Sequence, residues 1–183
     1  MHRVWIVFAA FLTAGFSQAG ELAGVVLPDQ VAVGQHRLVL NGMGLRKKAI
    51  FKVYVGALYL TSKSADPQAI LAADSPRRMV MRFLRDVGKG RLVEAWKEGL
   101  AANVPNATEN LSRDMERFLG FWEDVKEGQE VVMTYIPGQG TTVTFGGKEM
   151  GTIEGKAFAD ALLAVWLGPK PPSADFKAAL LGQ

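Results

Sequence analysis

Two consecutive helix-length segments stand between two groups of strand-like runs, and this order restricts the fold more than any other feature of the sequence. Residues 91–104 and 108–122 carry apolar side chains at helical spacing. Before them, residues 50–60 form the strongest strand pattern, rich in β-branched and aromatic side chains. A further helix is expected over residues 155–167. This order predicts an α+β fold, an antiparallel sheet covered by helices on one face.

Shorter patterns complete the layout. Residues 22–27 predict a short strand, residues 31–40 a hairpin, and the glycine-rich residues 41–44 a turn. Asp66, followed by a proline, predicts a helix start, because aspartate caps free N–H groups and proline fits the first helical position. Ser173 is expected to cap a last short helix. The remaining strands are expected over residues 78–84, 130–136, 141–145 and 149–153.

The first 19 residues have the organisation of a signal peptide. A basic start ending at Arg3 precedes an apolar stretch over residues 4–15, which is too short to span a bilayer as a helix. The small residues Ser17 and Ala19 then frame a cleavage site. The alternative is a buried N-terminal helix. The pattern predicts a periplasmic or secreted protein, with one mature domain over residues 20–183 and no stable membrane anchor after cleavage.

Composition argues against several classes of site. The chain has no cysteine, which excludes disulfides, thiol nucleophiles and most structural zinc sites. Only His36 would remain after signal removal, so a multi-histidine metal site is excluded and a catalytic triad would have to use this one histidine. The net charge of +3 falls to about +2 without Arg3, too little for a nucleic-acid footprint. We therefore expect no metal, no cofactor and no nucleic-acid partner.

Four short stretches of the mature region occur in an order that is informative when they are taken together. They are residues 42–46 (GMGLR), 52–60 (KVYVGALYL), 81–87 (MRFLRDV) and 153–158 (IEGKAF). The ordered set resembles the chalcone isomerase-like superfamily, especially its short bacterial exported branch. The resemblance implies an open-faced β-sandwich, in which helices cover a large antiparallel sheet and a pocket lies between the layers. The family contains plant enzymes that close a chalcone to a flavanone, and non-catalytic proteins that bind fatty acids.

The functional residues of the enzymes match this chain at one position in five. Arg46 corresponds to the arginine that stabilises the oxyanion of the substrate. Tyr54 stands where the enzymes have a threonine that polarises the ketone, and Val165 where they have a threonine or serine. The segment near residues 89–96 contains neither the tyrosine nor the asparagine that the enzymes use. An intramolecular lyase or isomerase is therefore the second interpretation of the function.

The fatty-acid-binding members agree better with these residues, because they pair the equivalent arginine with a tyrosine that helps to clamp a carboxylate. The resemblance implies that Arg46 and Tyr54 bind the head group of a fatty acid or other small amphiphilic acid. Arginine offers a charged, planar fork of donors, and a phenol adds a donor without adding charge. The apolar tail of the ligand is expected among Met79, Met81, Phe83, Trp96 and Val165.

Plainer interpretations of these residues stay open. Arg46 also fits an exposed cation beside two lysines, and Tyr54 an ordinary strand residue. The methionine and aromatic stripes also fit a plain core. An exported, non-catalytic binding protein is the first interpretation. A structural or interaction protein with a vestigial pocket is the third, and it would be favoured by side chains that fill the space between the sheet and the helices.

The signal peptide can be tested directly. The exported protein is expected to begin at Gly20, because cleavage follows the small-x-small signal that ends at Ala19. Intact-mass measurement of the protein recovered from the periplasm or the medium should give the mass of residues 20–183. Recovery of the uncleaved chain in the cytoplasm alone would contradict the prediction.

Overall fold

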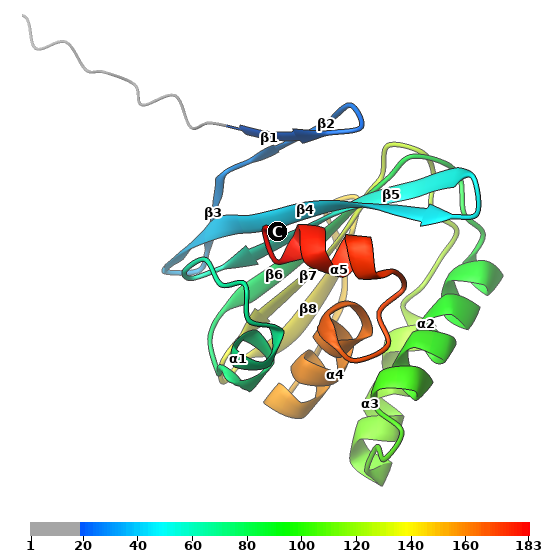
Figure 1. Ribbon diagram of the computed structural model, residues 1–183. Helices are drawn as coiled ribbons and strands as arrows, with labels where there is room; N and C mark the ends of the chain where they lie inside the picture. The colour runs from blue at the N-terminus through cyan, green and yellow to red at the C-terminus, as the bar shows by residue number, and fades with distance from the viewer. Residues whose placement is uncertain (1–18) are drawn as a thin grey trace, which may run out of the picture.

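The computed structural model describes residues 19–183. The predicted signal peptide over residues 1–19 lies outside the described residues, except for Ala19, which begins the first strand. Seven strands form one sheet, in which every neighbouring pair is antiparallel and the strand order follows the chain (Figure 1). These strands are β3 (Gln30–Val33), β4 (His36–Lys48), β5 (Phe51–Leu60), β6 (Arg77–Phe83), β7 (Glu130–Ile136), β8 (Gly140–Phe145) and β9 (Lys148–Ile153).

Figure 1 shows the helices gathered on one side of this sheet. They are α1 (Pro67–Ala72), α2 (Lys89–Asn103), α3 (Glu109–Gly120), α4 (Lys156–Leu167) and α5 (Ala174–Leu180). Helices α2 and α3 occupy the connection between the adjacent strands β6 and β7, as the sequence order predicts. The α+β prediction, an antiparallel sheet covered by helices, is confirmed. None of the helices within residues 19–183 is long and apolar enough to cross a bilayer.

Helix α4 is the most deeply buried helix segment of the described chain. Eight of its twelve residues are buried, among them Phe158, Leu162 and Trp166. These three residues are spaced four apart, so they lie along one side of the helix. A helix that is apolar on most of its circumference has to be covered on several sides. Helix α4 is accordingly in contact with α2, α3 and α1, and with strand β8 of the sheet.

A separate hairpin supports the other face of the sheet. It consists of β1 (Ala19–Leu22) and β2 (Val25–Pro28), and it corrects the single strand predicted over residues 22–27. Ala23 and Gly24 turn the chain between the two strands, with φ values of 51° and 81°. Val25 and Leu27 join a second apolar cluster with residues of β4 to β6. The hydroxyl of Tyr59 donates to the Pro28 carbonyl at 2.8 Å and fixes the end of the hairpin.

The turn predicted over residues 41–44 is wrong, because strand β4 runs through this segment. The glycines serve a close approach of helix α5. A Cβ atom on Gly42 would lie 2.1 Å from the Ala179 carbonyl oxygen, and one on Gly44 would lie 2.8 Å from the Phe176 ring. Asn41 is buried at a register shift between β4 and β5, and its amide donates to the Leu180 carbonyl at 2.8 Å. This segment is therefore the docking surface of the C-terminal helix.

Both predicted helix caps are confirmed. The Asp66 carboxylate accepts from the amides of Gln68 at 2.8 Å and Ala69 at 3.2 Å. The Ser173 hydroxyl accepts from the Phe176 amide at 3.1 Å. These caps satisfy N–H groups that lack partners inside the helix.

The close approach of α5 predicts a strong effect of Gly42→Ala. The new methyl group would meet backbone atoms of α5, which have to move as a unit, so we expect a loss of roughly 1–3 kcal/mol in the free energy of unfolding. Urea denaturation measures this loss. Gly90→Ala is the matched control, because no atom lies within 4 Å of its new Cβ and alanine suits a helix at least as well. Equal midpoints for Gly42→Ala and the wild type would contradict the docking of α5.

Candidate ligand-binding site between the sheet and the helices

Arg46 and Tyr54 lie directly opposite each other in the β4–β5 pair. Residues opposite each other in an antiparallel pair project from the same face, with Cβ atoms about 4.5–5.5 Å apart. Tyr54 belongs to the apolar cluster on the helix side of the sheet, so Arg46 leaves its strand on that side as well. The sequence alone did not decide which face of this strand meets the helices. The register and the packing of Tyr54 decide it.

Tyr54 is enclosed by aromatic side chains and is 7 % exposed. The rings of Phe83 and Phe176 lie 5.5 and 5.7 Å from its own, measured between centroids. The indole Nε1 of Trp166 donates a hydrogen bond to the Tyr54 hydroxyl at 3.0 Å. Burial raises the pKa of Tyr54 to about 12, against smaller lowering effects of the Trp166 hydrogen bond and the Arg46 charge. The phenol is therefore a neutral O–H group at physiological pH.

The proton of this hydroxyl has no acceptor within residues 19–183, since the one hydrogen bond of Tyr54 is accepted from Trp166. Buried donors normally have a partner. Arg46 is half-buried and uses Nη1 for the Lys47 carbonyl. Its guanidinium forms no ion pair with a carboxylate in the described part of the chain, although five other salt bridges are present there. The site therefore combines a buried neutral donor with a permanent cation, which is the complement of a carboxylate.

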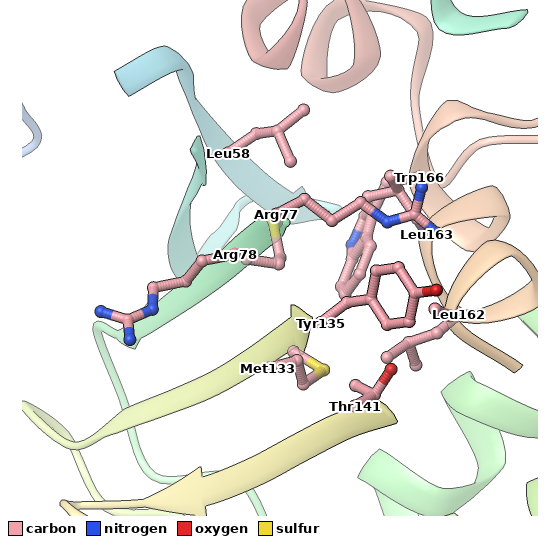
Figure 2. Close-up of a pocket in the computed structure, with 11 residues that line it drawn as sticks. Leu58, Arg77, Arg78, Met133, Tyr135, Thr141, Leu162, Leu163 and Trp166 are labelled. Carbon is pink, nitrogen blue, oxygen red and sulfur yellow. The ribbon is translucent and has the colours of Figure 1, made fainter. Parts of the chain in front are cut away.

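A small cavity lies on the other side of Trp166, between the sheet and helix α4 (Figure 2). Its volume is ≈ 20 Å³, room for about one water molecule. Figure 2 shows Trp166, Tyr135 and Thr141 directed toward this space, whereas the guanidinium of Arg78 points away from it. The Thr141 hydroxyl is buried without a hydrogen-bond partner among the described residues, so it is a polar group of the cavity wall that could bind a water molecule or a ligand atom. The lining is completed by Leu58, Arg77, Met79, Met133, Ala159, Leu162 and Leu163.

Two polar side chains of the cavity wall, Arg77 and Tyr135, already have hydrogen-bond partners. Arg77 is buried, and its guanidinium pairs with Asp160 of α4 at 2.5 Å and with the Ile70 carbonyl of α1 at 3.2 Å. The Tyr135 hydroxyl donates to Asp74 at 2.6 Å. Three acceptors, among them the Asp160 carboxylate, engage this buried cation and join α1 and α4 to the sheet. Arg77 is therefore a structural residue rather than a second head-group site.

Comparisons with known proteins give the family of this chain and its fold. The model of the family described as chalcone isomerase-like matches residues 19–182. The chain belongs to the chalcone isomerase-like family. Among solved structures, the crystal structure of a fatty-acid binding protein of Arabidopsis thaliana is similar, with a TM-score of 0.71 and 14 % sequence identity. The alignment covers 90 % of this chain and 96 % of that one, which shows a shared fold. No curated protein gave a match.

Within this chalcone isomerase-like fold, the residues predicted to hold a ligand tail lie in different surroundings. Met79 lines the cavity. Met81 and Phe83 are buried on the same face of β6, toward the helices. Trp96 packs against the rings of Phe118, Trp122 and Trp166, at centroid distances of 4.8, 5.4 and 5.1 Å. Val165 packs on helix α2, where a Cβ atom on Gly99 would come within 2.7 Å of it.

Side chains fill most of the space between the sheet and the helices. The small cavity does not reach Arg46 or Tyr54. A wider groove of ≈ 580 Å³ lies among α1, α3 and α4 and does not reach them either. Among residues 19–183, no three histidine, cysteine, aspartate or glutamate side chains gather in a way that could hold a metal ion. A ligand at Arg46 and Tyr54 therefore requires movement of the side chains that now cover Tyr54.

Sequence reasoning missed two residues of this site, Trp166 and Phe176. Trp166 stands four and eight residues after Leu162 and Phe158, and this spacing could have placed it on the inner face of its helix. Phe176 had no such signal. It lies on the short helix α5, whose position on the sheet follows from the glycines of β4 and β5.

The buried tyrosines predict a loss of stability at high pH. Burial raises the pKa values of all three tyrosines, Tyr54, Tyr59 and Tyr135, to about 12. Unfolded tyrosine ionises near pH 10, so the unfolded chain loses these protons first. The stability is therefore fully present below about pH 10 and falls as the pH rises toward 12. Tyrosinate absorbance and circular dichroism should change together in this interval, whereas protein unfolded in urea should titrate near pH 10. A tyrosinate signal near pH 10 from a folded chain would be inconsistent with the burial.

Proposed function

We propose that this protein is exported and that it binds a fatty acid or a similar amphiphilic carboxylate without catalysing a reaction of it. The observation that carries the proposal is the buried Tyr54 hydroxyl, whose proton lacks an acceptor among the described residues and which stands opposite Arg46 in the β4–β5 register. A carboxylate oxygen would accept from Tyr54, and the guanidinium would neutralise its charge. The likeness in fold to a fatty-acid binding protein supports the same ligand class.

Space for the tail would come from a change in the position of Trp166. This side chain both donates to Tyr54 and lines the small cavity, so its rotation would join the head-group site to that cavity. Met79 and Met133 line the cavity, and unbranched methionine side chains adjust readily to new neighbours. A ligand that binds the open form would shift the population toward it. Burial of the tail would supply most of the affinity, at about 0.8 kcal/mol per methylene.

A second candidate function is an interaction protein with a vestigial pocket. It is favoured by the packing between sheet and helices, where Trp96, Phe118 and Trp122 occupy the space that a ligand tail would need. Direct binding measurements distinguish the two candidates.

Native mass spectrometry with added palmitate tests the proposal. The wild type is expected to form a one-to-one adduct, and Arg46→Ala to weaken it roughly 10- to 100-fold through loss of a charge-assisted hydrogen bond. Tyr54→Phe should weaken it about fivefold, since it removes one neutral donor. Arg37→Ala is the matched control, because Arg37 is an exposed arginine on the same strand.

Tryptophan fluorescence gives a second measurement of the same binding, since Trp166 touches the proposed site. A palmitate adduct lost equally in Arg37→Ala and Arg46→Ala would exclude the Arg46 site. A wild type that forms no adduct and shows no fluorescence change would favour the interaction protein.

A further inference from the structure

The tip of the β4–β5 hairpin, residues 47–52, exposes two adjacent large apolar side chains. Ile50 is 87 % exposed and Phe51 is 53 % exposed. Val26 is the one other large apolar residue of the described chain with comparable exposure, at 58 %. Single exposed apolar residues are ordinary on protein surfaces. Here two of the three are consecutive at the end of a hairpin, which reaches the margin of the molecule in Figure 1.

The conformation of the turn does not account for this choice of residues. Lys48 and Phe51 are the last paired residues of the hairpin, so Ala49 and Ile50 form a two-residue connection. Such connections favour asparagine, aspartate and glycine. Ala49 instead takes a positive φ of 53°, which is uncommon for a residue other than glycine. A polar or glycine pair would form the turn more easily and would remove the apolar side chain of Ile50 from water.

Cations surround these two apolar side chains. Lys47, Lys48 and Lys52 are exposed on the two strands of the tip. The guanidinium of Arg85 lies over the Phe51 ring, 4.5 Å from its centroid. None of these four cations takes part in a salt bridge within residues 19–183. Asp86, the acidic residue next to Arg85 in sequence, is paired with Lys126 at 3.0 Å. The tip therefore presents uncompensated positive charge around an apolar point.

We propose that this hairpin tip docks on the surface of an anionic phospholipid bilayer. Ile50 and Phe51 enter the boundary between head groups and acyl chains, and Lys47, Lys48 and Lys52 contact the lipid phosphates. Apolar residues ringed by lysine and arginine suit such a surface, where burial and electrostatic attraction add. The cores of protein–protein interfaces are depleted in lysine, which argues against a protein partner for the same tip. The inference is independent of the ligand proposed for Arg46 and Tyr54.

Sedimentation with vesicles tests the docking. The purified protein is expected to bind vesicles that contain phosphatidylglycerol and to stay in solution with pure phosphatidylcholine. The double variant Ile50→Ser/Phe51→Ser should bind at least about tenfold more weakly, because it has lost the inserted side chains. Val26→Ser, the matched control at the other exposed apolar position, should bind as the wild type does. All three positions are exposed, and thermal unfolding checks that the variants keep the fold.

A second pair of variants separates the tip from net charge. Lys47→Gln/Lys48→Gln should lower binding roughly 25-fold, at about fivefold per lysine. Lys63→Gln/Lys97→Gln removes the same charge from exposed lysines elsewhere and should change binding less than about twofold. Equal losses in the two pairs, or unchanged binding of Ile50→Ser/Phe51→Ser, would overturn the proposal. A wild-type protein that does not bind anionic vesicles would also overturn it. Preferential binding to immobilised polyglutamate would overturn it as well and would indicate an acidic protein as the partner of the tip.

Discussion

The burial of helix α4 between the sheet and the other helices is the contact on which the rest of the structure depends. The chain has no cysteine, so packing rather than disulfides holds the layers together. Gly99 lets helix α2 approach Val165 of α4 closely. On the opposite side, Arg77 joins strand β6 to Asp160 of α4. With the helix held from several directions, the side chain of Trp166 is directed inward, against the Tyr54 hydroxyl and the small cavity.

That position of Trp166 gives the candidate site its chemistry. Its indole satisfies the acceptor of the Tyr54 hydroxyl and leaves the donor without a partner among the described residues. The same indole separates Tyr54 from the cavity at the inner face of α4. One hairpin then carries both proposed interactions, with Arg46 and Tyr54 along its strands and the apolar tip beyond them. A protein that takes an amphiphilic acid from a bilayer would need these two features close together.

Predictions from local signals succeeded where one physical cause acts over a few residues. The Asp66 and Ser173 caps follow from unpaired N–H groups at helix starts, and the strand over residues 50–60 from its dense β-branched and aromatic content. The turn predicted over residues 41–44 failed because glycine serves two purposes. It permits tight turns, and it also permits close approach of another segment. Only the packing of α5 distinguishes the second purpose here.

The sequence by itself determined the order of strands and helices from residue 50 onward, the class of fold and the residue types of the proposed clamp. The tertiary structure decided which side chains meet. Tyr54 and Trp166 are 112 positions apart, and their hydrogen bond exists because α4 is pressed against the sheet at one depth and one rotation. Packing likewise decided that little open space remains between the sheet and the helices, because aromatic side chains from α2, α3 and α4 pack against one another there. Spacing along a chain encodes which face of an element is apolar, whereas the fit between faces is a property of all the packed side chains together.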